Sequence, residues 1–224
     1  MIKPDQLVLF DDWETSTGAL ELFPAVWNAA QNLAHPDNSI RKSALESLVE
    51  MGAPRLSPLI AYLIASRLMD PDIEIRKQVV RILGELLILD KDGRETDSII
   101  RQYVAAYLAQ MRTRTVYSLL QVADEEAELD GMVAKILNSC PYAGEHLADI
   151  FNDRKVPISV RKKAIYFTGQ VGYLDTIPDL ERLEARLTSR LTGQQAMSFA
   201  ATGLADETEL FPLVQQALSL LKEP

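Results

Sequence analysis

Three arginines recur at equivalent places in this sequence and are its most regular candidates for binding chemistry. Arg41, Arg76 and Arg161 each follow a proline by four or five residues and open an apolar stretch. A row of guanidinium groups could bind carboxylates or phosphates, because each offers a planar fork of donors. We favour a structural ladder, in which each arginine pairs with an acidic residue of a neighbouring turn, since interior arginines need such pairing. Asp70 and Asp153 are suitably placed partners.

Other residue types that catalyse reactions are few and scattered. The chain has two histidines, His35 and His146, and a single cysteine, Cys140. Neither histidine has a metal ligand at helical or hairpin spacing. A cysteine nucleophile needs a base and an electropositive pocket, which the surroundings of Cys140 do not indicate. We therefore expect no catalytic residues, no metal and no cofactor, with His35 in a turn and Cys140 as a structural thiol.

One acidic run, residues 124–130, could suggest calcium binding. It lacks the glycine and the ligand spacing of an EF-hand loop, so we interpret it as a solvated helix start. The glycines of the chain form no phosphate-binding loop, and no Gly-x-Ser-x-Gly elbow occurs. These patterns favour a protein that is not an enzyme.

Charge argues against a general nucleic-acid binder. The 224-residue chain carries 32 acidic and 23 basic residues, a formal net charge of −9. Binding to phosphate backbones requires a basic stripe that displaces counterions. The acidic excess lies at the ends, with −4 on residues 1–21 and −4 on residues 175–224, so a local basic patch in the middle stays possible.

Location follows from two further features. A single cysteine permits no disulfide within the chain, which suits a reducing cytoplasm. The longest apolar stretch, residues 56–69, is interrupted by Arg67 and is shorter than the roughly 20 residues that span a bilayer. We expect a cytoplasmic protein with no membrane segment.

The elements that position these residues repeat along the chain. Residues 36–44 align with 71–79, 35 residues later, and the phrase returns at 157–164. Such self-similarity is typical of a helical repeat array. Apolar residues at i, i+3, i+4 and i+7 predict helices over 40–51, 75–89 and 160–171, and no segment between 20 and 220 alternates like a strand. The predicted fold class is all-α.

Helix boundaries repeat as well. Asp37 and Asp72 are placed to cap helix N-termini. Gly52 and Gly172 are placed where helices end in a left-handed conformation. Prolines suited to a first helical turn precede the other helix of each pair, at Pro24, Pro58, Pro178 and Pro212.

The phrase at residues 70–79, its echo at 35–44 and the glycine-loop-proline joints resemble the HEAT repeat family, in particular its short bacterial repeats of the phycobilin-lyase type. The resemblance covers residues 22–89 and 157–221. It implies a right-handed α-α superhelix of about five to six helical pairs. By this resemblance residues 22–224 form a single HEAT-like solenoid, irregular at 90–140.

The middle of the chain departs from the pattern. Candidate helices fall near 97–110, 113–123, 126–139 and 142–152. Strict alternation of first and second helices fails there, because the helix at 160–171 should be a second helix but comes ninth. Either one repeat has lost a helix, or two of the candidate segments are one helix.

Residues 1–21 precede the first repeat. They contain the apolar run 7–10 and Trp13 among acidic residues. A solenoid needs a cap over its first apolar face, so we favour an N-terminal cap. A short motif that engages another protein is the alternative.

The remaining candidate for function is a surface. Off the apolar stripe, second helices carry mixed charges with an interleaved tyrosine, which suit a protein partner. We expect a scaffold or adaptor that binds another protein along a concave face. Its predicted binding residues are Lys77, Arg81, Lys162, Tyr166 and Gln170.

Two other functions are implied by the resemblance alone. A phycobilin-lyase-like or phycobiliprotein-interacting protein would bind a linear tetrapyrrole. A damaged-DNA-binding HEAT protein would bind nucleic acid, which the net charge of −9 opposes.

Overall fold

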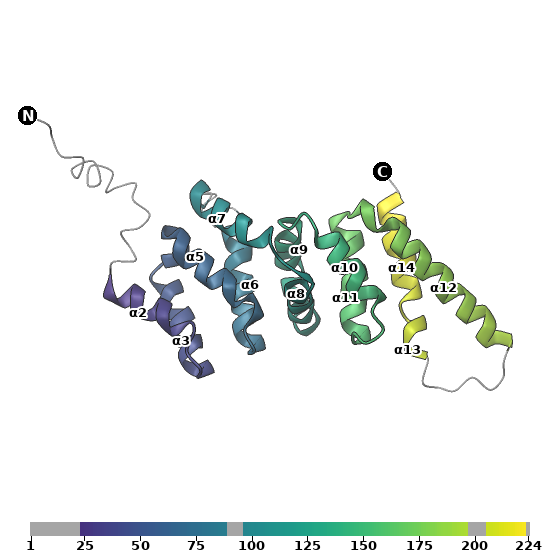
Figure 1. Ribbon diagram of the computed structural model, residues 1–224, viewed down its shortest axis with the longest axis horizontal. Helices are drawn as coiled ribbons and strands as arrows, with labels where there is room; N and C mark the ends of the chain where they lie inside the picture. The colour runs from purple at the N-terminus through teal and green to yellow at the C-terminus, as the bar shows by residue number, and fades with distance from the viewer. Residues whose placement is uncertain (1–22, 89–95, 197–204, 223–224) are drawn as a thin grey trace, which may run out of the picture. The chain divides into compact units, whose positions relative to one another are not determined.

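The computed structural model describes residues 23–88, 96–196 and 205–222 (Figure 1). All regular structure among them is helical, and none of these residues forms a strand, so the all-α prediction is confirmed. In these same ranges, no helix combines the length and apolar character needed to cross a bilayer. The predicted cap over residues 1–21, with Trp13, lies outside the described residues.

The chain divides into two compact units, Met1–Tyr107 and Leu108–Pro224. Each unit is described by itself below. The prediction of one continuous solenoid over residues 22–224 stays a prediction.

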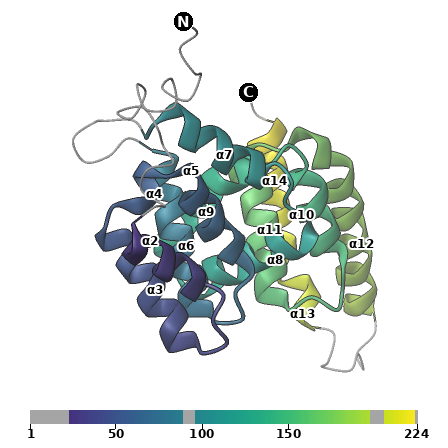
Figure 2. The same ribbon diagram turned by 60° about the vertical axis from the view of Figure 1, so that its left-hand side comes forward.

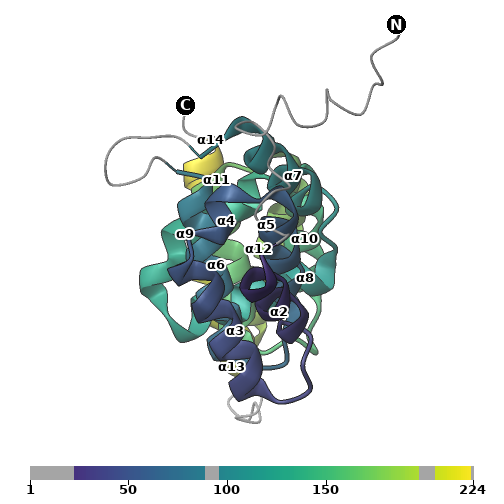
Figure 3. The ribbon, with the colours of Figure 1, turned by 90° about the vertical axis from the view of Figure 1, so that its left-hand side faces the viewer.

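Unit 1 contains the first two copies of the repeated phrase. Its helix α2 packs on α3, and α5 packs on α6 (Figure 3). Leu45, Leu48, Ile60, Ile64 and Leu83 are buried between these helices. The helices of unit 1 are α2 (Pro24–Asn32), α3 (Asn38–Glu50), α4 (Ala53–Leu56), α5 (Pro58–Ala65), the 3-10 helix η3 (Ser66–Met69), α6 (Ile73–Leu86) and α7 (Ser98–Leu108), which ends at the boundary with unit 2.

The predicted aspartate caps are confirmed. Asp37 accepts a hydrogen bond from the backbone N–H of Ser39 at 2.8 Å, and Asp72 accepts one from Glu74 at 2.8 Å. These bonds satisfy N–H groups that have no partner inside the helix. The pKa of each carboxyl lies below its ordinary value. The largest cause is a hydrogen bond from the Ser39 hydroxyl for Asp37 and one from the Asn38 side chain for Asp72, and the backbone bonds lower the pKa further.

The predicted glycines and prolines are confirmed too. Gly52 has φ +67° and Gly172 has φ +89°, the left-handed region in which a side chain is strained. Each glycine lets the chain turn sharply after a second helix of a pair. The four prolines occupy first-turn positions: Pro24 and Pro58 begin α2 and α5, and Pro178 and Pro212 are second in α12 and α14.

Unit 2 is built around α11. This helix packs on α10, α14 and α8, and Phe151 and Phe167 are fully buried in the unit's core (Figure 2). The helices of unit 2 are α8 (Thr113–Glu125), η4 (Ala127–Leu129), α9 (Asp130–Asn138), α10 (Ala143–Asn152), α11 (Ile158–Val171), η5 (Leu174–Thr176), α12 (Ile177–Ala196), α13 (Ala205–Thr208) and α14 (Phe211–Lys222).

The structure resolves the helix order between residues 90 and 140. The four candidate segments are four separate helices, α7 to α10, so no two of them are one helix. Pairs form as α8 with α9, α10 with α11 and α12 with α14, so α11 is a second helix. Helix α7 begins like a second helix, because Asp97 accepts a hydrogen bond from the N–H of Ile99 at 2.8 Å. This order agrees with a repeat that has lost its first helix.

The acidic run 124–130 is not a single helix start, and that interpretation is wrong. It covers the end of α8, the 3-10 helix η4 and the first residue of α9. Glu126 leaves the helical conformation with φ −143° and ψ 93°, and Leu129 is buried. Burying Leu129 therefore requires a bend in the middle of the run.

Candidate functional site

Arg41 and Asp70, two members of the predicted ladder, lie in contact. Arg41 Nε and Nη2 each donate to a carboxylate oxygen of Asp70 at 2.8 Å, and both side chains are buried. Arg41 Nη1 also donates to the carbonyls of His35 and Pro36 at 2.9 and 3.0 Å. The hydrogen bond with Asp70 raises the pKa of Arg41. This bidentate pair ties the turn before α3 to the turn before α6 and leaves no donor fork for a ligand.

Arg161 has a different acidic partner from the one expected. Its Nε donates to the carbonyl of Phe151 at 2.8 Å, and its Nη2 donates to Glu207 Oε1 at 2.9 Å. Asp153 is exposed and accepts a hydrogen bond from the N–H of Lys155 within its own turn. Asp153 was expected as a ladder partner, and that expectation is wrong, because its carboxylate is exposed and Arg161 donates to Phe151 and Glu207 instead.

Arg76 lies half-buried in the first turns of α6, the fourth residue after Asp72, as Arg41 is the fourth after Asp37. Its backbone N–H donates to the carbonyl of Asp72 at 3.2 Å. The place of Arg76 in the ladder stays a prediction.

The predicted binding residues fall in both units. Lys77 and Arg81 lie on α6 in unit 1, where Lys77 Nζ donates to Glu74 Oε1 at 2.8 Å and Arg81 is half-buried. The other three lie on α11 in unit 2. Their common surface stays a prediction.

On α11 the three side chains differ in their surroundings. Lys162 forms an ion pair with Glu209, and Gln170 is exposed. The ring of Tyr166 is half-buried and meets the ring of Phe167 edge-on, with centroids 5.1 Å apart. The ammonium group of Lys163 lies 5.6 Å from the centroid of Tyr166. Tyr166 is thus held by packing rather than freely presented.

A groove lies between α3 and α6, the second helices of the two helix pairs of unit 1. It has a volume of about 300 Å³ and contains the predicted residue Arg81. Leu45, Val49 and Ile82 are its apolar residues. Its lining residues are Leu45, Glu46, Val49 and Glu50 from α3, and Gln78, Arg81, Ile82 and Glu85 from α6.

Two features of this groove, named here the α3–α6 groove, favour ligand binding. Val49 is 47% exposed, which is costly for an aliphatic side chain beside other apolar residues. Gln78 Oε1 is buried and accepts no hydrogen bond from the described residues. A buried acceptor without a donor destabilises a fold until something supplies one. The groove therefore offers an apolar contact to an incoming segment, next to a polar side chain whose buried oxygen lacks a donor among the described residues.

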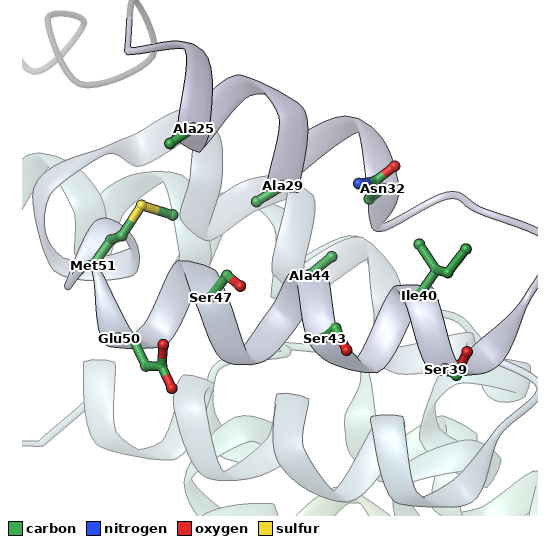
Figure 4. Close-up of a pocket in the computed structure, with 10 residues that line it drawn as sticks. All are labelled: Ala25, Ala29, Asn32, Ser39, Ile40, Ser43, Ala44, Ser47, Glu50 and Met51. Atoms are coloured by element: carbon green, nitrogen blue, oxygen red, sulfur yellow. The ribbon is translucent and has the colours of Figure 1, made fainter.

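A second groove lies between α2 and α3, with a volume of about 530 Å³ (Figure 4). Small side chains face it from both helices, among them Ala25 and Ala29 from α2 and Ser43 and Ser47 from α3. Its lining contains no histidine, cysteine or basic residue. This lining offers no histidine to activate a serine and no positive charge to hold an anion.

Both histidines serve local structure. His35 Nδ1 accepts the N–H of Asp37 at 3.1 Å, as expected for a turn. His146 lies between Thr113 Oγ1, at 3.0 Å from Nδ1, and the carbonyl of Met111, at 3.1 Å from Nε2. Within the described ranges, no three His, Cys, Asp or Glu side chains are grouped to hold a metal ion.

Cys140 is buried, as expected for a structural thiol. Burial raises the pKa of its thiol, although a backbone hydrogen bond at Tyr142 acts in the opposite direction. Because the thiolate is the reactive form, we expect the native protein to react with a thiol reagent at least about a hundredfold more slowly than the urea-unfolded chain. The reagent releases a chromophore when it reacts with the thiol, and the absorbance of that chromophore measures both rates. Equal rates would show that Cys140 is accessible in the native state.

Sequence patterns did not reveal the α3–α6 groove or Glu207. The groove depends on which faces of α3 and α6 meet, and Glu207 lies 46 residues from the arginine that it binds. The sequence contained one signal for the surroundings of Glu207: Arg182, Arg186 and Arg190 recur every four residues, which places them on one helical face.

Scans of protein-family models, of curated proteins and of solved structures found no match to this chain.

Proposed function

We propose that this chain is a HEAT-like α-solenoid, a right-handed superhelix of about five to six helical pairs. Repeated helix pairs support this proposal, with the same cap at Asp37, Asp72 and Asp97 and the same left-handed glycine at Gly52 and Gly172. It acts as a non-enzymatic scaffold in the cytoplasm and binds another protein through its second helices.

The α3–α6 groove is the single observation that carries this function. Second helices of adjacent repeats line the inner face of such solenoids, and here two of them enclose an apolar groove. Helical segments commonly bind proteins by inserting apolar side chains into a groove of this kind. A partner helix would cover the exposed side chain of Val49.

The charge of the groove specifies the partner further. Glu46, Glu50 and Glu85 line it against one basic residue, Arg81, so its lining carries a net charge of −2. Complementary charge accelerates association and excludes partners of like charge. The preferred partner is therefore an amphipathic helix with one apolar face and basic flanks.

A synthetic peptide tests this preference directly. The probe is an amphipathic helical peptide with leucines on one face and lysines on the other, compared with the same pattern carrying glutamates. We expect the lysine peptide to bind at least about tenfold more tightly than the glutamate peptide, measured by fluorescence anisotropy. Binding weakens as NaCl is raised, because salt screens the exposed charges.

Val49→Lys locates the site and has a matched control. This residue lies in the groove at 47% exposure, whereas Leu59 on α5 has a similar exposure, 44%, and is not among the groove's lining residues. We expect Val49→Lys to weaken binding of the lysine peptide at least about tenfold and Leu59→Lys to leave it unchanged. Circular dichroism should show equal helicity and melting for both. Equal loss in the two variants, or equal binding of the two peptides, would refute this site.

A further inference from the structure

Four arginines of unit 2 surround a single carboxylate. The nearest is Arg161 on α11, whose Nη2 lies 2.9 Å from Glu207 Oε1. Arg186 Nη2 on α12 lies 3.2 Å from the same oxygen, and Arg190 on α12 forms an ion pair with the other oxygen. Arg154, in the loop between α10 and α11, places its Nε 3.7 Å from Oε1. Segments far apart in sequence thus bring four positive charges to one negative charge.

The cluster has a buried layer and an exposed layer. The side chains of Arg161 and Glu207 are 4% and 9% exposed, so this pair forms the interior. By contrast, Arg154 is 56% exposed, Arg186 32% and Arg190 28%. The three outer guanidinium groups are therefore accessible to a solute. The guanidinium group of Arg41, by contrast, is buried against Asp70 and is not accessible.

Charge in the cluster is not balanced. Four arginines against one glutamate leave a surplus of three positive charges, in a chain whose net charge is −9. Two acidic residues that lie close to the cluster in sequence and are described have partners of their own: Asp153 accepts the N–H of Lys155, and Glu209 pairs with Lys162. Like charges this close repel one another, and the cost is higher where water is partly excluded.

The environment of Arg186 shows this repulsion. Burial lowers the pKa of its guanidinium; Glu207 raises it, while Arg154, Arg161 and Arg190 lower it further. Its Nε is buried and has no hydrogen-bond partner among the described residues. A second anion beside Arg186 would both relieve the repulsion and accept from this nitrogen.

We propose that Arg154, Arg186 and Arg190 form a binding site for a phosphate monoester dianion. A dianion reduces the charge surplus of the cluster from three to one, whereas a carboxylate would leave two. Its three terminal oxygens suit several guanidinium forks at once. The phosphate is either that of a small molecule or one carried on a phosphorylated side chain of a bound protein. This site lies in unit 2 and does not depend on the α3–α6 groove.

Binding of inorganic phosphate and of a short phosphoserine peptide tests the site on the full chain. At constant ionic strength, ¹⁵N-labelled arginine Nε–Hε signals report contact, and calorimetry gives the affinity. We expect phosphate to shift arginine signals and acetate at the same concentration to leave them unchanged. A phosphoserine peptide that binds more tightly than phosphate, while its unphosphorylated form does not bind, identifies a protein-borne phosphate; equal affinities identify a small molecule.

Substitutions assign the binding to the cluster. Arg154→Gln and Arg186→Gln should each weaken phosphate binding about tenfold. Arg182→Gln is the matched control, because Arg182 lies on the same helix, is 74% exposed and pairs with Asp179 outside the cluster. Arg154 is exposed, so Arg154→Gln should leave the melting temperature unchanged. This variant therefore still tests phosphate binding if Arg186→Gln folds poorly. Unshifted arginine signals, a response to acetate equal to that to phosphate, or equal weakening in Arg182→Gln would overturn the proposal.

Discussion

Asp70→Ala is expected to lower the free energy of unfolding of unit 1 by about 3 kcal/mol. The substitution leaves the buried guanidinium of Arg41 without its two bonds to carboxylate oxygens. It also removes the acceptor for the backbone N–H of Asp72, 2.9 Å from Asp70 Oδ1. Trp27 lies on α2, and neither tryptophan falls in the sequence of unit 2, so urea unfolding followed by tryptophan fluorescence measures unit 1 selectively.

Asp153→Ala provides the comparison for this prediction. Asp153 also precedes a second helix and caps its own turn, through the N–H of Lys155 at 2.9 Å, but its side chain is exposed and binds no arginine in the described part of the chain. Its loss should cost no more than about 1 kcal/mol. Similar losses of unfolding free energy in the two variants would show that the Arg41–Asp70 pair adds no stability to that of the hydrogen bond within the turn.

Glu207→Gln is expected to lower the stability of unit 2 by about 3 kcal/mol. Glutamine keeps the size of the side chain but removes the one negative charge that the described residues place among the four arginines, so their repulsion is no longer compensated. Far-UV circular dichroism during urea unfolding measures the loss. The transition seen by tryptophan fluorescence should not change, because neither tryptophan falls in the sequence of unit 2. A change seen only in the fluorescence transition would contradict the assignment of this stabilising effect to unit 2.

The effect of Glu207→Gln depends on pH with a definite sign. Burial raises the pKa of Glu207, but the hydrogen bond from Arg161 and the charges of Arg161, Arg186 and Arg190 lower it more, to below its ordinary value of 4.5. A carboxyl whose folded pKa is depressed stabilises the fold above its unfolded pKa. The difference between wild type and variant should thus be complete above about pH 5 and shrink as the pH falls through the folded pKa. A difference that grew in acid would contradict the pairing.

Local features of the fold were predictable from the sequence. Asp37, Asp72, Gly52 and Gly172 act within one turn of their own position, so residue type and spacing determine what each does. The helices at 40–51, 75–89 and 160–171 followed from apolar periodicity for the same reason, because the period of a helix is a property of neighbouring residues.

Partners across the fold were only partly predictable. Asp70 was predicted to be a ladder partner because it lies in the repeated phrase at residues 70–79, but its pairing with Arg41, 29 residues away, was not specified. Glu207 was missed for Arg161, since it lies 46 residues away in a part of the chain where the phrase is degenerate. Where the repeated phrase is no longer recognisable, the spacing of two residues in sequence does not predict their distance in space.

The sequence by itself therefore determined the class of the fold, the presence of its repeated helices and the type of residue at each cap and turn, although each of these helices begins two residues before its predicted start. Tertiary structure alone decided that Val49 and Gln78 share a groove and that Arg154, Arg186 and Arg190 gather around one carboxylate. The physical reason is range: caps and helical periods depend on residues within a few positions, whereas grooves and charge clusters depend on how separate helices pack.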